Sequence, residues 1–191
     1  MKILIGLIIS AMTLGLPNQV VAQTAVEIEW DKPEKYRDVR PSNESRKRFR
    51  ETTFERINEY MNELASALPD NNKLLMKVSE LDLAGRVLPA SFAGLGMSGS
   101  NVRVVKSIDI PRINFSYQLL GASGEVLQEA KVELKDMSFL DRSNHMFRSE
   151  ALRYEKNMLQ RWFNTEFEAL VAQKDASKGT NKESNKALNN S

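Results

Sequence analysis

The sequence has no cysteine and a single histidine, His145, among its 191 residues. Without cysteine the chain cannot form a disulfide, a thiol nucleophile or a thiolate metal site. Zinc sites of the finger or HExxH type need at least two histidine or cysteine ligands, so one histidine excludes them as well. We therefore expect no metal and no cofactor at this protein.

A strong excess of either charge is also missing. The chain has 27 Lys and Arg against 25 Asp and Glu, which gives a net charge of +2. Proteins that bind nucleic acid usually carry a clear basic excess, because much of their affinity comes from neutralising phosphates. We expect no nucleic acid among the partners. No segment after residue 22 is apolar enough to cross a membrane, which needs about 20 such residues.

Residues 1–22 have the pattern of a secretory signal peptide. Lys2 precedes an apolar run over 3–16, and Val20 and Ala22 suit the −3 and −1 positions of a cleavage site before Gln23. An N-terminal anchor or a core helix is the alternative reading. A lipid anchor on cysteine is excluded. We expect an exported periplasmic protein without a transmembrane anchor after processing.

Two segments have the apolar periodicity of amphipathic helices. The first spans 44–67, where Ser42 or Asn43 can cap it. The second spans 145–172, and its apolar stripe includes Trp162, which is expected in the core although it could line a groove with Tyr154. The stripe of the first helix consists of Phe49, Thr53, Ile57, Met61 and Leu64, and that of the second of Phe147, Ala151, Leu152, Met158, Leu159, Trp162, Phe163, Phe167 and Leu170.

The remaining periodic segments alternate apolar and polar residues, as half-buried strands do. The clearest is a hairpin over 111–137 that turns at the sequence GASG. Further strands are predicted at 26–30, 73–83 and 101–108.

The order β-α-β-β-β-β-α favours an α+β fold. We expect a two-layer sandwich in which two long helices cover one face of a mostly antiparallel sheet of four or five strands. The domain is predicted over 23–172. Residues 173–191 have almost no apolar side chains and are predicted to be a disordered tail.

Gly94, Gly96 and Gly99 match the dinucleotide fingerprint G-x-G-x-x-G. That fingerprint must follow a strand and open a helix, because the helix N-terminus binds the pyrophosphate. Here the glycines lie in a long segment, 84–100, and lead into the β-branched run of 102–105. We interpret 84–100 as a loop that could be mobile and serve as a gate or a contact with a partner.

Catalytic sets are not evident. Asp141, Ser143 and Ser149 lie near His145 in sequence, but a helix cap explains them more simply than a catalytic triad does. Four carboxylates near strand ends or turns could serve a glycosidase-like hydrolase if two of them converged. They are Asp82, Asp109, Asp136 and Asp141.

Basic residues gather before and within the start of the first helix. Their position opposes the helix dipole, which favours negative charge there. A solvated surface explains them most simply, and the functional alternative is contact with an anionic lipid surface or an acidic envelope protein. The residues of this cluster are Arg37, Arg40, Arg46, Lys47, Arg48 and Arg50.

Several segments together resemble a family of exported proteobacterial proteins, the domain of unknown function 3016. The resemblance covers about residues 25–170 and is carried by PEKYRDVRPSN, LDLAG, NVRVVKSIDIPRINFSYQL, KDMSFL and RSEALRYEKNMLQRWFNTEF. It implies a protein of the Gram-negative cell envelope, and it brings no enzymatic activity, cofactor or catalytic residue.

The sequence favours a non-catalytic interaction or accessory protein of the cell envelope. The first alternative is a carrier of lipid or another small ligand, gated by the loop over 84–100. The second is a hydrolase that works through carboxylates such as Asp82 and Asp136.

Overall fold

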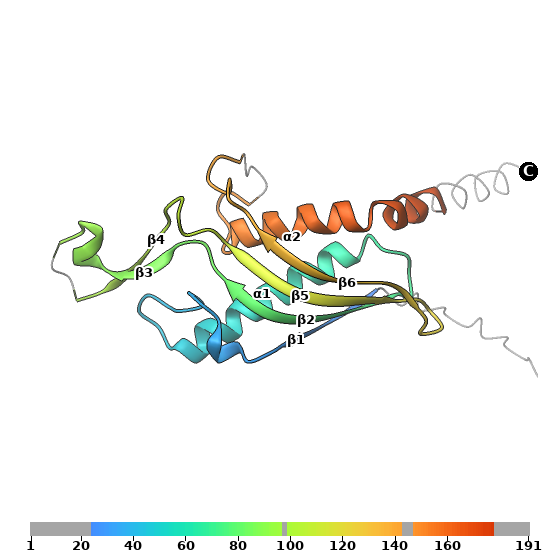
Figure 1. The fold of residues 1–191 in the computed structure, drawn as a ribbon, viewed down its shortest axis with the longest axis horizontal. Coiled ribbons are helices and arrows are strands. Elements are labelled where there is room, and N and C mark those ends of the chain that lie inside the picture. The colour runs from blue at the N-terminus through green and yellow to red at the C-terminus, as the bar shows by residue number, and fades with distance from the viewer. Residues whose placement is uncertain (1–23, 97–98, 143–146, 178–191) are drawn as a thin grey trace, which may run out of the picture.

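The structure is a computed structural model that describes residues 24–96, 99–142 and 147–177. It is an α+β fold, as predicted, with six strands, two long helices, a further helical stretch over 168–177 and two short 3-10 helices in these residues (Figure 1). Their bounds are β1 Ala25–Trp30, η1 Pro33–Lys35, α1 Arg46–Ala65, β2 Lys73–Asp82, β3 Arg86–Pro89, η2 Ala90–Ala93, β4 Asn101–Val104, β5 Arg112–Leu120, β6 Val126–Lys135 and α2 Arg153–Glu166.

The main sheet has four strands in the order β1-β2-β5-β6. β1 pairs with β2 in parallel, while β2–β5 and β5–β6 are antiparallel. The alternating pattern of each strand sets the register, because a slip of one residue would turn every apolar side chain to the other face. One row of inward side chains thus crosses all four strands, from Ile28 through Met76 and Tyr117 to Ala130.

Both helices cover the same face of this sheet, as the sequence predicts (Figure 1). α1 presents Ile57 and Met61 to the core, and α2 presents Leu159 and Phe163, each at most 3 % exposed. Trp162 is 8 % exposed and packs edge-on against Phe115, so its predicted place in the core is confirmed. Burying such side chains stabilises the fold by roughly 1.5–3 kcal/mol each.

The second helix differs from its predicted span of 145–172. Within the described residues it starts only at Arg153, because Leu152 adopts a left-handed conformation with φ 58° that an α-helix cannot contain. Phe147 lies in the turn that precedes the helix, and its side chain is buried there. The backbone breaks at Phe167, and residues 168–177 are helical again.

The helical residues run past 172, where the sequence predicts a disordered tail. Lys174 is 8 % exposed, and its Nζ donates to Ser66 O at 2.9 Å and Leu68 O at 2.7 Å. It also pairs with Asp70 at 2.9 Å. A cation bound to free carbonyls at the end of α1 is favourable for the helix dipole. Residues 178–191 lie outside the described part.

The segment 84–100 is not simply a loop, contrary to the sequence prediction. It holds β3 and η2, and β3 pairs with β4 in a separate two-stranded sheet. The predicted strand over 101–108 is shortened to β4 and pairs only with β3. This hairpin, which we call the arm (residues 86–104), lies at one end of the long axis of the molecule (Figure 1).

Candidate functional site

The arm leaves the main sheet at a glycine. Gly85 has φ +77°, and a Cβ there would lie 2.6 Å from Val104 O, so only glycine fits without strain. Its amide donates to Asp109 O at 3.0 Å. The chain therefore turns away from β2 at this residue, and β3 starts a sheet of its own.

Arg103 fastens the base of the arm to the body. One terminal nitrogen donates to Gly85 O at 2.9 Å, and the other donates to Asp38 O at 2.6 Å and Arg40 O at 2.8 Å. Its guanidinium also lies over the Phe49 ring. Burial lowers the pKa of Arg103 from its ordinary value. These bonds satisfy three backbone carbonyls, so the arm and the segment around residue 40 form one unit.

The tip of the arm exposes large apolar side chains. Phe92 in η2 is 80 % exposed, and Leu95 just after it is 63 % exposed. Gly94 ends η2 with φ +74° and so leaves both side chains at the surface. A short two-stranded sheet has no core in which to bury them. Exposed apolar groups next to polar surroundings are typical of interaction sites.

The predicted basic cluster lies beside this arm. Asn43 pairs with the backbone of Asn101 through two hydrogen bonds of 3.0 Å. Asn101 in turn pairs with Pro89, the last residue before η2. We call residues 37–50 the basic segment: its residues 38–43 lie along the arm from Arg103 to Asn101, and at Phe49 it is again beside Arg103 at the base of the arm.

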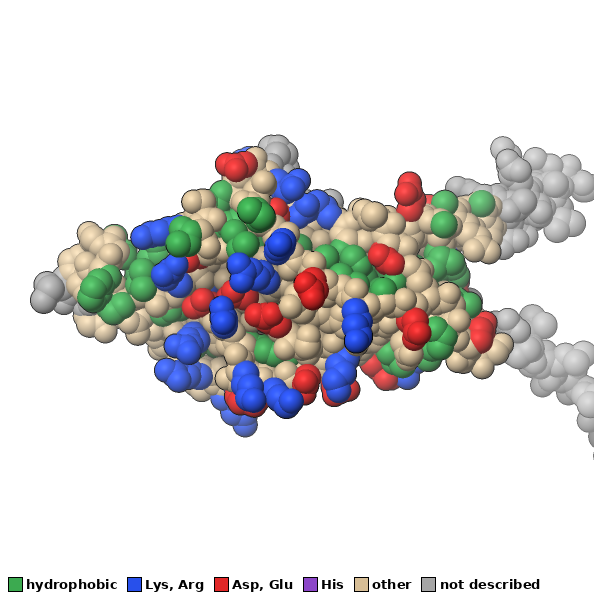
Figure 2. All heavy atoms as spheres, viewed as in Figure 1, with side chains coloured by type: hydrophobic (Ala, Val, Ile, Leu, Met, Phe, Trp, Pro, Cys, Tyr) green, Lys and Arg blue, Asp and Glu red, His purple; other side chains and the backbone are tan. Residues whose placement is uncertain are grey.

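The cations of the basic segment are largely free of ion pairs. Lys47 pairs with Glu51 at 3.8 Å, an exposed contact of little strength. In the described part of the chain, none of the other five forms an ion pair, and all but the half-buried Arg50 are exposed. The first turn of α1 contains no acidic residue. Figure 2 shows Lys and Arg side chains from the middle of the body to the base of the arm, with Asp and Glu side chains among them.

Asn43 and Ser42 do not cap α1, although the sequence suggests that either could. The N-cap residue is Ser45, without a side-chain hydrogen bond. Asn43 instead joins the basic segment to the arm, and the helix N-terminus keeps its unfavourable cations. Local stability therefore does not explain the basic residues of the first turn.

The carboxylates considered for hydrolysis separate into two groups. Asp136 is 3 % exposed and accepts ion pairs from Arg142 at 3.2 Å and Arg161 at 2.5 Å. The Arg161 contact joins the end of β6 to α2, and the Arg142 contact holds the segment that follows β6, which gives Asp136 a structural role. Asp141 donates its amide to Ser138 O within a turn.

Asp82 and Asp109 do line one hollow, of about 200 Å³, together with Asp38, Arg37 and Arg112. Burial and the neighbouring Asp38 raise the pKa of Asp82. Oδ2 of Asp109 is buried and has no hydrogen-bond partner among the described residues, while Oδ1 accepts from Arg86 Nε at 2.7 Å. Two of the four predicted acids thus line a common hollow.

A second hollow of about 300 Å³ lies at the base of the arm, between the start of α1 and the start of α2. Arg103, Tyr154 and Glu155 contribute to its wall. Glu155 is 2 % exposed, its Oε1 accepts from the Ala84 amide at 2.7 Å, and burial raises its pKa. A pocket thus exists near the predicted loop, but beneath the base of the arm and not beneath its tip.

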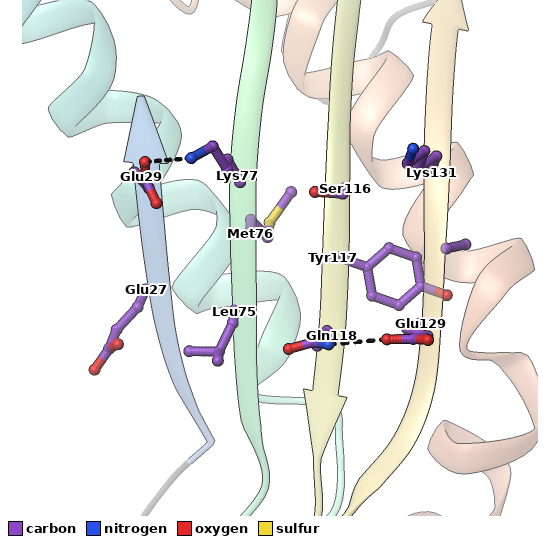
Figure 3. Close-up of a pocket in the computed structure, with 11 residues that line it drawn as sticks. Glu27, Glu29, Leu75, Met76, Lys77, Ser116, Tyr117, Gln118, Glu129 and Lys131 are labelled. Carbon is purple, nitrogen blue, oxygen red and sulfur yellow. Dashed lines mark hydrogen bonds and ion pairs between the residues drawn. The ribbon is translucent and has the colours of Figure 1, made fainter. Parts of the chain in front are cut away.

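The open face of the main sheet is a shallow trough of about 680 Å³ (Figure 3). Some of its polar groups pair across strands, since Lys77 pairs with Glu29 at 2.7 Å and Gln118 donates to Glu129 at 2.8 Å. The labelled side chains stand side by side along the strands and do not converge on one point. The trough resembles a solvated sheet surface.

Sequence reasoning missed Phe92, Leu95, Arg103 and Glu155. The sequence does contain a signal for exposure of Phe92 and Leu95, because the arm has no Asp or Glu and places these apolar residues among small ones. Arg103 and Glu155 carry none, since their burial depends on segments that are distant in sequence. Gly94, Gly96 and Gly99 lie at or near the tip and lead into β4, a strand, as predicted. The mobility of this segment stays a prediction.

Three predictions fall outside the described residues: the signal peptide over 1–22, the role of His145 and Ser143, and the tail beyond 177. Within the described residues, no group of three His, Cys, Asp or Glu is placed to hold a metal. None of the described helices has both the length and the apolar character to span a bilayer.

Comparison with known families matches residues 24–165 to the family described as Protein of unknown function (DUF3016). The chain therefore belongs to this family, as its sequence motifs indicate. Neither the curated proteins nor the solved structures contain a match to it.

Proposed function

We propose that this protein is a non-catalytic interaction protein of the bacterial cell envelope, exported to the periplasm, and that it attaches to a negatively charged surface. The observation that carries the proposal is the combination at one end of the molecule: an exposed apolar tip beside a segment whose cations, apart from Lys47, form no ion pair within the described residues. Such an arrangement attracts an anionic surface from a distance and then contacts it.

The position of the cations supports this interpretation over a merely solvated surface. Cations in the first turn of a helix oppose its dipole, and each such contact typically costs a few tenths of a kcal/mol. In α1 neither an acidic residue nor a cap hydrogen bond offsets this cost.

A charge-reversal pair tests the attachment. We expect Arg46→Glu/Arg48→Glu to reduce sedimentation of the purified protein with isolated envelope fragments by about tenfold. The control Lys131→Glu/Lys135→Glu changes the net charge equally on exposed positions of β6 and should sediment like the native protein. Attachment of the native protein should weaken with added salt. Equal loss in both variants would refute a specific basic surface.

Export is tested separately. Expression of the full chain with a C-terminal tag, followed by cell fractionation and N-terminal sequencing, should give a periplasmic protein that starts at Gln23. A protein that keeps Met1 in the cytoplasm would contradict the proposal.

A second candidate is a hydrolase, favoured by the hollow that holds Asp82 and Asp109. An acid whose pKa is raised, near a second carboxylate, is a common feature of catalytic sites. Incubation with a panel of ester, glycoside and peptide substrates tests this function. Turnover that Asp82→Asn abolishes would favour the hydrolase over the interaction protein.

A further inference from the structure

We propose that the arm is a membrane-docking element: Phe92 and Leu95 insert into the interface of a bilayer rich in anionic phospholipid, while the basic segment contacts its headgroups. This inference rests on the proposed function, because it names the surface to which the basic segment attaches. That surface is phospholipid, and the vesicle experiment below distinguishes it from a protein partner.

Exposure and shape support insertion. Phe92 is 80 % exposed and Leu95 63 % exposed, in a part of the molecule that projects from the end of the sheet (Figure 1). A tip with this shape can enter an interface without displacing the body. A globular partner can bind a flat apolar patch as well as a projecting one. A bilayer favours a narrow apolar projection, because the polar body of the protein then stays in water.

Charge supports anionic lipid as the surface. The arm contains no Asp or Glu, so nothing on it repels phosphate groups. Arg40 and Asn43 are tied to the arm by the bonds of Arg103 and Asn101, which hold the basic segment at a fixed place beside it. Cations near an anionic leaflet strengthen attachment within about a Debye length of its surface.

Neither the apolar tip nor the basic segment would be sufficient alone for stable attachment to a membrane. A few apolar groups give only weak and reversible binding to a membrane, and stable attachment takes a second, electrostatic contribution. The two contributions lie in different segments of the sequence, so each can be removed by itself.

The test uses the mature protein with vesicles of phosphatidylethanolamine and phosphatidylglycerol, and with vesicles of phosphatidylcholine alone. We expect binding to the anionic vesicles only. Phe92→Ser/Leu95→Ser should weaken this binding about tenfold or more, since both apolar contacts are lost. The matched control Val126→Ser/Leu127→Ser removes exposed apolar groups, 52 % and 48 % exposed, from the opposite end of the sheet and should bind like the native protein.

A spectroscopic measurement reports insertion directly. In Phe92→Trp, the new indole should shift its emission to shorter wavelength with anionic vesicles and be quenched by brominated acyl chains. Trp162 is buried and Trp30 packs face to face on Phe54, so neither native tryptophan should respond.

The outcomes separate the two proposals. If Arg46→Glu/Arg48→Glu abolishes vesicle binding while Phe92→Ser/Leu95→Ser does not, insertion is refuted and electrostatic attachment stands. The native protein could bind neither kind of vesicle and still sediment with envelope fragments in a way that Arg46→Glu/Arg48→Glu abolishes. In that case the surface is a protein and the inference is wrong. If Arg46→Glu/Arg48→Glu changes neither vesicle binding nor sedimentation with envelope fragments, the proposed function itself is wrong.

Discussion

The body and the arm treat the same kinds of residue in opposite ways. Phe163 of the body is 1 % exposed and contacts Phe167 in an edge-on arrangement, whereas Phe92 of the arm is 80 % exposed. The body has a sheet and two helices with which to enclose apolar groups. The arm has two four-residue strands and a 3-10 helix, too little structure to enclose any. The difference teaches that apolar residues in the body serve stability, while those in the arm are available for contact.

The largest expected effect is on the body. Phe163→Ala should lower the free energy of unfolding by about 3–5 kcal/mol, because it leaves a cavity between α2 and the sheet. Urea denaturation followed by circular dichroism measures the change. A loss below about 1 kcal/mol would show that this core is loosely packed.

A smaller effect is expected at the junction between the two regions. Gly85→Ala should cost roughly 1–3 kcal/mol, because the new Cβ meets Val104 O and the positive φ is strained. Hydrogen exchange should show the loss of protection mainly in β3 and β4. Gly99→Ala is the matched control, since nothing lies within 4 Å of its Cβ position. Equal effects of the two substitutions would contradict a strained junction.

The next prediction concerns pH. Burial raises the pKa of Glu155 above its ordinary 4.5, so the folded state binds this proton more tightly than the unfolded state does. Stability from this group is therefore complete below pH 4.5 and is lost as the pH rises through the folded-state pKa. Glu155→Gln keeps an acceptor for the Ala84 amide and removes the titration.

Denaturation of Glu155→Gln and the native protein across this range measures the difference. The native protein should lose stability relative to the variant as the pH rises above 4.5. The charge of Asp82 also contributes to raising the pKa of Glu155, so the comparison is repeated with Asp82→Asn in both proteins, which removes the titration of Asp82 from the difference. Parallel stability curves would show that Glu155 does not titrate differently on folding.

The smallest effect on stability is expected at the tip. Phe92→Ala should change the free energy of unfolding by no more than about 0.5 kcal/mol, because the side chain is solvated in the folded protein. The same urea measurement as for Phe163→Ala tests this. A large loss would mean that Phe92 packs within the molecule, and the contrast between arm and body would disappear.

Much of the body could be predicted from the sequence. The stripe of α1 and the alternation of β5 and β6 are local patterns, and they define which side of each element is buried. α1 was placed to within two residues at each end. The start of α2 was missed because a left-handed residue such as Leu152 leaves no signal in an apolar stripe.

The candidate site was predictable only in part. The basic segment is a contiguous run and was recognised, but its attachment to the arm depends on Arg103 and Asn101, more than 50 residues away from their partners. The hairpin nature of 84–100 was missed, since its glycines and short strands are equally compatible with a loop.

The sequence by itself determined the α+β class, the single buried face of the sheet and the family, because side-chain periodicity and motifs are properties of neighbouring residues. Only the tertiary structure decided that the arm stands apart from the sheet, that its apolar tip is exposed, and that unpaired cations lie beside it. Those features arise from backbone turns and hydrogen bonds between distant segments, and exposure exists only once the whole chain has folded.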